Sequence, residues 1–140
     1  EAGVAVVMGH EIAHAIARHG NERMSQEYAK QGAGLLFSEW VSTKPELAQQ
    51  LFNTAFAIGT EVAVILPFSR AHESEADRMG LIFMAMAGYD PNEAISFWMR
   101  MAAAGGAKPP EILSTHPSNE TRISDIRTHL PEALKYYKPN

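Results

Sequence analysis

Apolar residues recur every three or four positions along most of this chain of 140 residues, and no stretch shows the alternation typical of a β-strand. This spacing predicts helices, and Gly and Pro residues mark where they end. We expect helices at 2–18, 22–40, 45–66, 70–87 and 91–103, then one that Ser118 caps and a short one at 131–137. The length fits one mainly helical domain that spans residues 1–140.

The predicted helix boundaries rest on a few residues. Gly20 is expected to follow the first helix in the left-handed conformation, and Asn21 to cap the second. Pro67 is expected to end the third helix, because proline lacks the amide hydrogen that a helix interior needs. Ser69 then caps the fourth helix, and Gly88 closes it.

The segment 51–66 is apolar enough to raise the question of a membrane span. Asn53, Thr54 and Glu61 interrupt it, and its apolar length falls short of the ~20 residues that a span needs. The sequence therefore favours a buried or amphipathic helix here, and no membrane span within the chain.

Charge and cysteine content exclude several functions. The net charge of −4 and the pI near 5.8 leave no basic stripe for a nucleic acid, so we expect no nucleic-acid partner. Zero cysteines exclude disulfides, thiolate zinc sites and thiol nucleophiles. A catalytic or metal site must therefore use histidines and carboxylates.

His10, Glu11 and His14 form a His-Glu-x-x-His motif within the first predicted helix. At 3.6 residues per turn the two histidines lie on one face, where their nitrogens can converge on a single ion. Glu11 is turned by about 100° from His10, close enough to take a proton from a water molecule at that ion. This layout is typical of the metal helix of a zinc peptidase.

A third ligand is expected from a carboxylate downstream. Glu73 and Asp77 lie one turn apart on the fourth predicted helix, whereas Glu75 points elsewhere. We assign Glu73 as the ligand, and Asp77 as the acceptor of the Nδ1 proton of a ligating histidine.

Two simpler alternatives need no metal. The acidic residues 73–77 can form a solvated face that pairs with Arg70 and Arg78, and the chain can be a plain helical bundle. The presence of the His-Glu-x-x-His motif favours the interpretation in which Glu73 binds the same metal as the two histidines. A metal assay decides between these interpretations.

Three blocks of sequence resemble the M48 family of zinc metallopeptidases, in the same order as in that family. They are His10-Glu11-x-x-His14, Ser69-Arg70-x-x-Glu73-x-x-Ala76-Asp77, and Thr115-His116-Pro117-Ser118 with Arg122-Ile123. The resemblance implies a mainly helical, gluzincin-type catalytic domain with one zinc ion on His10, His14 and Glu73. It also implies that Glu11 is the general base.

The resemblance further implies active-site roles for His116 and Arg122. His116 either donates a hydrogen bond to the oxyanion or binds the metal in a resting state. Arg122 either anchors a substrate carbonyl or holds the loop of His116. We favour the second role, because an arginine in the first turns of a helix can reach back over its own entry loop.

The expected function is that of a zinc endopeptidase acting on proteins or peptides. A soluble member of the envelope-protease type fits best, which implies a bacterial periplasmic or cell-envelope location and a part in protein quality control. Related domains carry an N-terminal part with a substrate-binding edge strand, so we expect this chain to be a fragment whose partner is that segment or an additional domain. The alternative is a non-catalytic, metal-stabilised helical scaffold or chaperone-like module.

Overall fold

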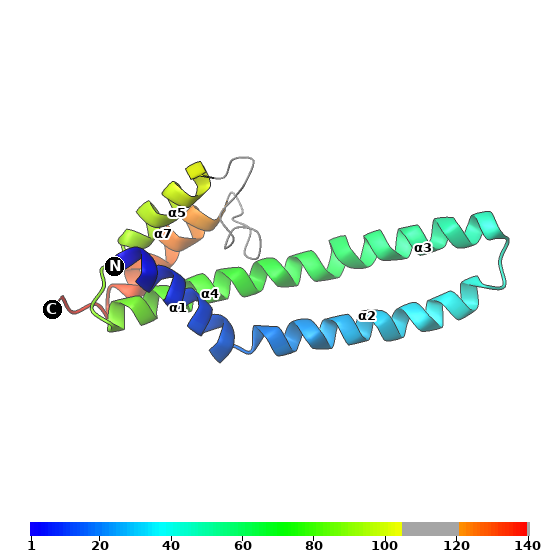
Figure 1. Ribbon diagram of the computed structural model, residues 1–140, viewed down its shortest axis with the longest axis horizontal. Coiled ribbons are helices and arrows are strands. Elements are labelled where there is room, and N and C mark those ends of the chain that lie inside the picture. Colours follow the sequence, from blue (N-terminus) through cyan, green and yellow to red (C-terminus); the bar gives the residue numbers. More distant parts are fainter. Residues whose placement is uncertain (105–120, 140) are drawn as a thin grey trace. The chain divides into compact units, whose positions relative to one another are not determined.

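The computed structural model describes residues 1–104 and 121–139, and these are helical without any strand (Figure 1). The prediction of a mainly helical chain is therefore confirmed for the described residues. The length suggested one domain, and the structure divides the chain into two compact units. Unit 1 comprises residues Glu1–Ala17 and His72–Asn140, and unit 2 comprises Arg18–Ala71.

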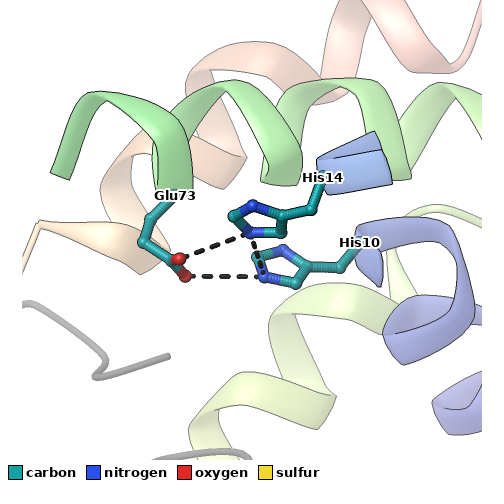
Figure 2. Close-up of side chains that lie close together, drawn as sticks. All are labelled: His10, His14 and Glu73. Atoms are coloured by element: carbon teal, nitrogen blue, oxygen red, sulfur yellow. Dashed lines mark hydrogen bonds and ion pairs between the residues drawn. The ribbon is translucent and has the colours of Figure 1, made fainter. Parts of the chain in front are cut away.

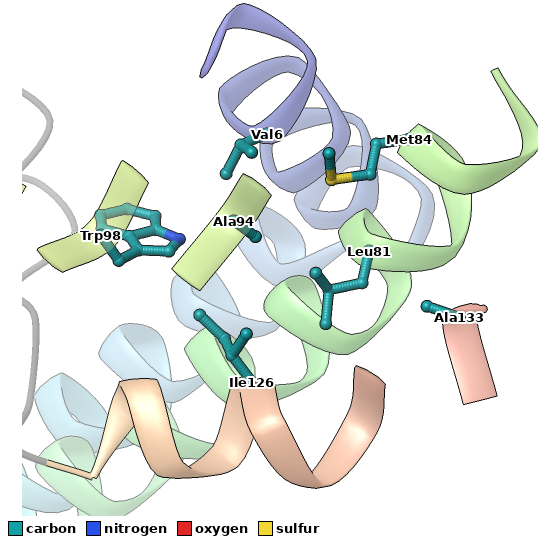
Figure 3. Close-up of a cluster of buried hydrophobic side chains, with 7 residues drawn as sticks. All are labelled: Val6, Leu81, Met84, Ala94, Trp98, Ile126 and Ala133. Carbon is teal, nitrogen blue, oxygen red and sulfur yellow. The ribbon is translucent and has the colours of Figure 1, made fainter. Parts of the chain in front are cut away.

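Over residues 1–17, 72–104 and 121–139, unit 1 contains four helical segments around one apolar core. These are α1 (Ala2–Ile16), the part of α4 (Leu66–Met86) that follows residue 71, α5 (Glu93–Ala104) and α7 (Arg122–Ala133). Each segment contributes to the core, as Figure 3 shows, and its buried members are Val6, Leu81, Met84, Ala94, Trp98, Ile126 and Ala133. The core fixes the helices that carry the predicted site residues.

Two glycines allow α1 and α4 to approach closely. A Cβ atom on Gly9 would lie 2.7 Å from the carbonyl oxygen of Gly80, and one on Gly80 would lie 2.9 Å from the backbone nitrogen of His10. Both distances are too short for a real methyl group, so any larger residue would force the helices apart. This contact holds His10 against the helix that carries Glu73 and Asp77.

The junction after α1 differs from the prediction. α1 ends at Ile16, Arg18 has the left-handed φ of 58°, and α2 (His19–Val41) begins at the next residue. The carbonyl of Arg18 accepts hydrogen bonds from the amides of the third and fourth residues after it, so the new helix starts before Asn21. The roles predicted for Gly20 and Asn21 are therefore wrong. The left-handed turn is made by Arg18, at a cost of about 1–2 kcal/mol.

Unit 2 contains a helical hairpin of α2 and α3 (Glu46–Thr60), which Figure 1 shows joined by a short turn. Aromatic rings hold the two helices together: Phe37 stacks on Phe56 with centroids 4.8 Å apart, and Trp40 meets Phe52 edge to face at 5.7 Å. None of the α3 residues is buried. The sequence favoured a buried or amphipathic helix in this region; α3 forms a helix, and it is not the buried one.

Pro67 does not end the helix that contains α3. A π-helical turn, η1 (Glu61–Ile65), follows α3 directly and leads into α4, so one helix runs from Glu46 to Met86. The amide of Leu66 bonds to the carbonyl of Glu61, and this wider turn accommodates the proline ring without breaking the helix. The predicted boundary at Pro67 and the cap at Ser69 are wrong, because the π turn lets the helix continue through the proline.

This continuous helix also changes the membrane question. Within the described residues it is the helix long and apolar enough to cross a bilayer, by length and composition alone. The sequence predicted an apolar segment too short for a membrane span because it placed the end of the helix before Pro67. Since the helix continues through Pro67, this argument from length is wrong.

The remaining ends agree with the prediction in part. Gly88 has a φ of 85° and closes α4, as expected. Asp90 accepts a hydrogen bond from the amide of Asn92, and α5 begins at Glu93, two residues later than predicted. Pro131 lies inside α7 and does not start another helix, because α7 runs through it to Ala133. The predicted cap at Ser118 lies outside the described residues.

Candidate metal centre

His10, His14 and Glu73 come together in unit 1 (Figure 2). The two histidines project from α1 and the glutamate projects from α4. The Nε2 atoms of the histidines lie 3.1 Å apart, and the Glu73 oxygens lie 3.4 Å from His10 Nε2 and 3.3 Å from His14 Nε2. Sequence reasoning selected these three residues, and the structure brings their ligand atoms within 4.8 Å of one another.

These distances fit a single zinc ion. Ligand atoms held about 2.0–2.1 Å from one tetrahedral zinc lie roughly 3.3 Å from each other. Without a proton or a cation among them, two imidazole nitrogens and a carboxylate at this spacing repel, because each presents a lone pair or a negative charge. The donor set is also the type that zinc prefers.

Asp77 supports His10 from the side away from this cluster. Its Oδ1 atom lies 2.8 Å from His10 Nδ1, and both side chains are buried. A proton on Nδ1 donated to Asp77 leaves the lone pair of the neutral ring on Nε2, where a metal can be bound. Burial lowers the pKa of His10, but the hydrogen bonds to Asp77 and Glu73 outweigh it and raise the pKa above its ordinary value.

Arg122 is the buried cation of the site, with only 3% of its surface exposed. Its Nη2 atom donates to Asp77 Oδ1 at 2.6 Å, and its Nη1 atom lies 3.6 Å from Glu73 Oε2. The guanidinium carbon lies 3.6 Å from the centroid of the Trp98 ring, a cation–π contact. Arg122 thus contacts both supporting carboxylates, a position that favours bracing them over reaching a substrate.

The charges of the site also favour a divalent cation. Glu73 and Asp77 bring two negative charges into a largely buried region, where Arg122 contacts both of them. Buried charges in proteins are paired or coordinate metals, and the Glu73 carboxylate also faces both histidines, so a cation bound there would be compatible with the charges of the site.

Glu11 follows His10 on α1, and its side chain is exposed. An exposed carboxylate that directly follows a ligand residue in the chain is accessible to water, as a general base must be. His116 lies outside the described residues, so the role predicted for it and the loop that Arg122 was expected to hold stay predictions.

Two contributors to the site were missed from the sequence. Trp98 was not among the predicted site residues, yet its ring is both buried in the core and stacked under Arg122. Gly9 and Gly80 were not singled out, although they set the distance between the helices. Each glycine lies within a helix and within three residues of a site residue, which was the available signal.

The model of peptidase family M48 matches residues 1–130 of this chain. The chain belongs to this family. The proteins that it resembles include the mitochondrial metalloendopeptidase OMA1 of Schizosaccharomyces pombe, at 39% identity over 95% of this chain. The beta-barrel assembly-enhancing protease of Escherichia coli is 33% identical over 91% of this chain.

This chain corresponds to only part of the length of these relatives. This chain spans 38% of the S. pombe protein and 27% of the E. coli protein. The human metalloendopeptidase OMA1, mitochondrial, is 31% identical over 92% of this chain, which spans 26% of it. No solved structure was found to match. Because some relatives are named mitochondrial, the family does not fix a bacterial compartment.

Proposed function

We propose that this chain is the catalytic domain of a zinc-dependent endopeptidase that hydrolyses peptide bonds in proteins. The observation that carries the proposal is the convergence of His10, His14 and Glu73 at distances that suit one zinc ion. Membership of a peptidase family and the exposed Glu11 beside this cluster support it.

Each residue has a distinct part in the proposed reaction. His10, His14 and Glu73 would hold the zinc, which when bound polarises the scissile carbonyl and makes water more acidic. Glu11 accepts the proton of the attacking water and delivers it to the leaving amine.

The buried residues keep these groups in place. Asp77 holds the proton of His10 on Nδ1 and so fixes both the tautomer and the orientation of the ring. Arg122 holds Asp77 and Glu73 near each other, and Trp98 supports the guanidinium from one face. The metal cluster is thus braced by a second set of contacts before any substrate arrives.

The first experiment measures zinc content after exhaustive dialysis, by elemental analysis. We expect about one zinc per chain in the wild type, much less in Glu73→Ala, and no change in Glu75→Ala. The control residue lies two positions away on the same helix, and its side chain is exposed. Equal zinc content in the two variants would remove Glu73 from the ligand set.

A second experiment separates catalysis from a structural role of the metal. Glu11→Gln keeps the shape of the side chain and removes its basicity, so we expect normal zinc content with casein hydrolysis reduced by roughly 10²–10⁴-fold. Wild-type protein that binds zinc but cleaves neither casein nor a quenched peptide would favour the non-catalytic scaffold instead.

We further propose that the protein acts in a bacterial periplasm or cell envelope, in protein quality control. The relatives named for beta-barrel assembly support this location, whereas those named mitochondrial favour a mitochondrion. Fractionation of cells that express the tagged natural protein tests it, and recovery in the cytosolic fraction would contradict it.

A further inference from the structure

The hairpin of unit 2 exposes large apolar side chains along much of its length. We use the name apolar hairpin for residues 31–68, which include the end of α2, all of α3 and η1, and the first residues of α4. Its large apolar residues with at least 39% of their surface exposed are Leu35, Leu36, Trp40, Leu47, Leu51, Phe52, Ile58, Val62, Val64, Leu66 and Phe68. Contiguous exposure on this scale is rare on soluble monomers and marks an interaction surface.

The longer helix of the apolar hairpin has the length of a bilayer core. From Leu47 to Phe68 it rises by about 33 Å at 1.5 Å per residue, and the hydrocarbon core of a bilayer is about 30 Å thick. A core helix of a soluble protein can pass the same composition test because it is buried, but none of the most apolar window of this helix is buried.

Charges are almost absent from this part of the hairpin. Between Leu47 and Phe68 the one charged residue is Glu61, and its Oε2 atom lies 3.3 Å from Lys30 Nζ on α2. Pairing of this kind is how ionisable groups are accommodated within membranes. The α2 residues from 31 to 38 carry no charge at all.

The end of the hairpin has the composition of a membrane interface. Lys44 in the turn lies 4.9 Å from the ring centroid of Trp40, and Glu39 and Glu46 flank the turn. Tryptophan and lysine are residues that anchor helix ends at the level of lipid headgroups.

The directions of the exposed side chains favour lipid over a protein partner. Leu35 and Leu36 are adjacent on α2, and Leu51 and Phe52 are adjacent on α3, so each pair points in directions about 100° apart. The exposed apolar surface of each helix is therefore broader than a single narrow stripe. A single protein surface covers one side, whereas hydrocarbon chains cover all sides.

We propose that the apolar hairpin inserts into the hydrocarbon region of a lipid bilayer and attaches the protein to a membrane. The proposal does not depend on the proposed function, because every residue on which it rests lies in unit 2 and the metal cluster lies in unit 1. A membrane attachment of this kind is driven by apolar burial, so it should resist high salt.

The test is flotation of the purified full chain with phosphatidylcholine vesicles at low salt and in 1 M NaCl. We expect the protein to float with the vesicles in both conditions. Trp40 fluorescence should shift to the blue and be quenched by brominated lipids, and Trp40→Phe should remove this quenching. The other tryptophan, Trp98, is buried in the core of unit 1 and should not respond.

Matched variants locate the attachment. The double variant Leu51→Asp/Ile58→Asp changes two exposed residues of the hairpin and should reduce flotation at least tenfold, with circular dichroism unchanged. Met86→Asp changes an equally exposed apolar residue outside the hairpin and should float like the wild type. Equal flotation of the two variants would overturn the proposal.

Other outcomes would also overturn it. Protein that remains in the lipid-free fraction as a dimer by light scattering, and that the double variant converts to a monomer, would assign the apolar hairpin to a second copy of the chain. Flotation only with anionic vesicles, lost in 1 M NaCl, would show headgroup attraction without insertion.

Discussion

The two tryptophans of this chain occupy opposite environments, and the contrast separates the two units. Trp98 in unit 1 is 2% exposed, packed in the core and stacked against Arg122. Trp40 in unit 2 is 52% exposed, near the tip of the hairpin. Both lie on helices, so helix formation alone does not decide where an apolar side chain is placed.

The interiors of the two units differ in the same way. Unit 1 encloses apolar residues together with the buried charges of Asp77 and Arg122, while the hairpin directs large apolar residues outward. A buried charged site demands rigid packing around it, because each charge must keep its partner. An exposed apolar surface is stabilised by contact with another apolar surface or with lipid. The predicted metal chemistry of unit 1 and the proposed membrane attachment of unit 2 are therefore separate properties.

The largest expected effect is on stability. Trp98→Ala removes a buried ring from the core of unit 1 and from beneath Arg122, so we expect a loss of about 3–5 kcal/mol in the free energy of unfolding. Trp40→Ala removes an exposed ring and should cost about 1 kcal/mol or less. Thermal unfolding by circular dichroism checks both. Similar costs for the two variants would contradict the contrast between the units.

The next effect is on the metal. Asp77→Asn removes the charge that accepts the His10 proton, so we expect zinc affinity to fall by about 10–100-fold, measured by competition with a chelator. Asp125→Asn on α7 is the control, because this carboxylate does not belong to the group that could hold the metal. A zinc affinity unchanged in Asp77→Asn would mean that His10 is oriented without this contact.

Gly80→Ala should act on the contact between α1 and α4. The added methyl group would overlap the backbone of His10, so we expect a loss of about 1–3 kcal/mol in stability together with weaker zinc binding. Gly59→Ala adds the same methyl group where nothing lies within 4 Å, and should stabilise the helix slightly. If Gly80→Ala behaves like Gly59→Ala, the close approach does not position the site.

The smallest effect is expected at an exposed ion pair of unit 1. Arg78 donates to Glu132 at 2.7 and 2.6 Å, and this hydrogen bonding lowers the pKa of Glu132 below its ordinary 4.5. Because the folded pKa is lowered, the stabilisation is present at neutral pH and is lost as the pH falls through the folded pKa. Glu132→Gln should lower Tm slightly at pH 7, and the difference should disappear in acid. A difference that persists in acid would show that the carboxylate charge is not its cause.

Local patterns in the sequence were enough to predict most of the helices and to select His10, His14 and Glu73 as one group. The spacing of His10 and His14, and of Glu73 and Asp77, follows directly from the helical period, so residues that share a face can be paired from their positions in the chain. Gly88 was also predicted correctly as the end of α4, since this depends on nearby residues alone.

The errors arose where neighbouring turns or distant helices decided the outcome. Pro67 was expected to stop a helix, but the π turn before it removes the clash that proline usually causes. The roles predicted for Arg122, toward a substrate or its own entry loop, stay predictions, and its contact with Asp77, 45 positions away, is one that no local pattern reveals.

The sequence by itself determined that the chain is helical and which side chains could bind a metal, because both follow from the identity and the spacing of nearby residues. Only the tertiary structure decided how those groups meet. The glycine contact between α1 and α4 sets the distance, Arg122 on Trp98 supplies the buried charge, and the exposure of the hairpin shows which apolar residues lack a protein core. These contacts and exposures depend on which distant segments pack together, and the spacing of nearby residues does not predict them.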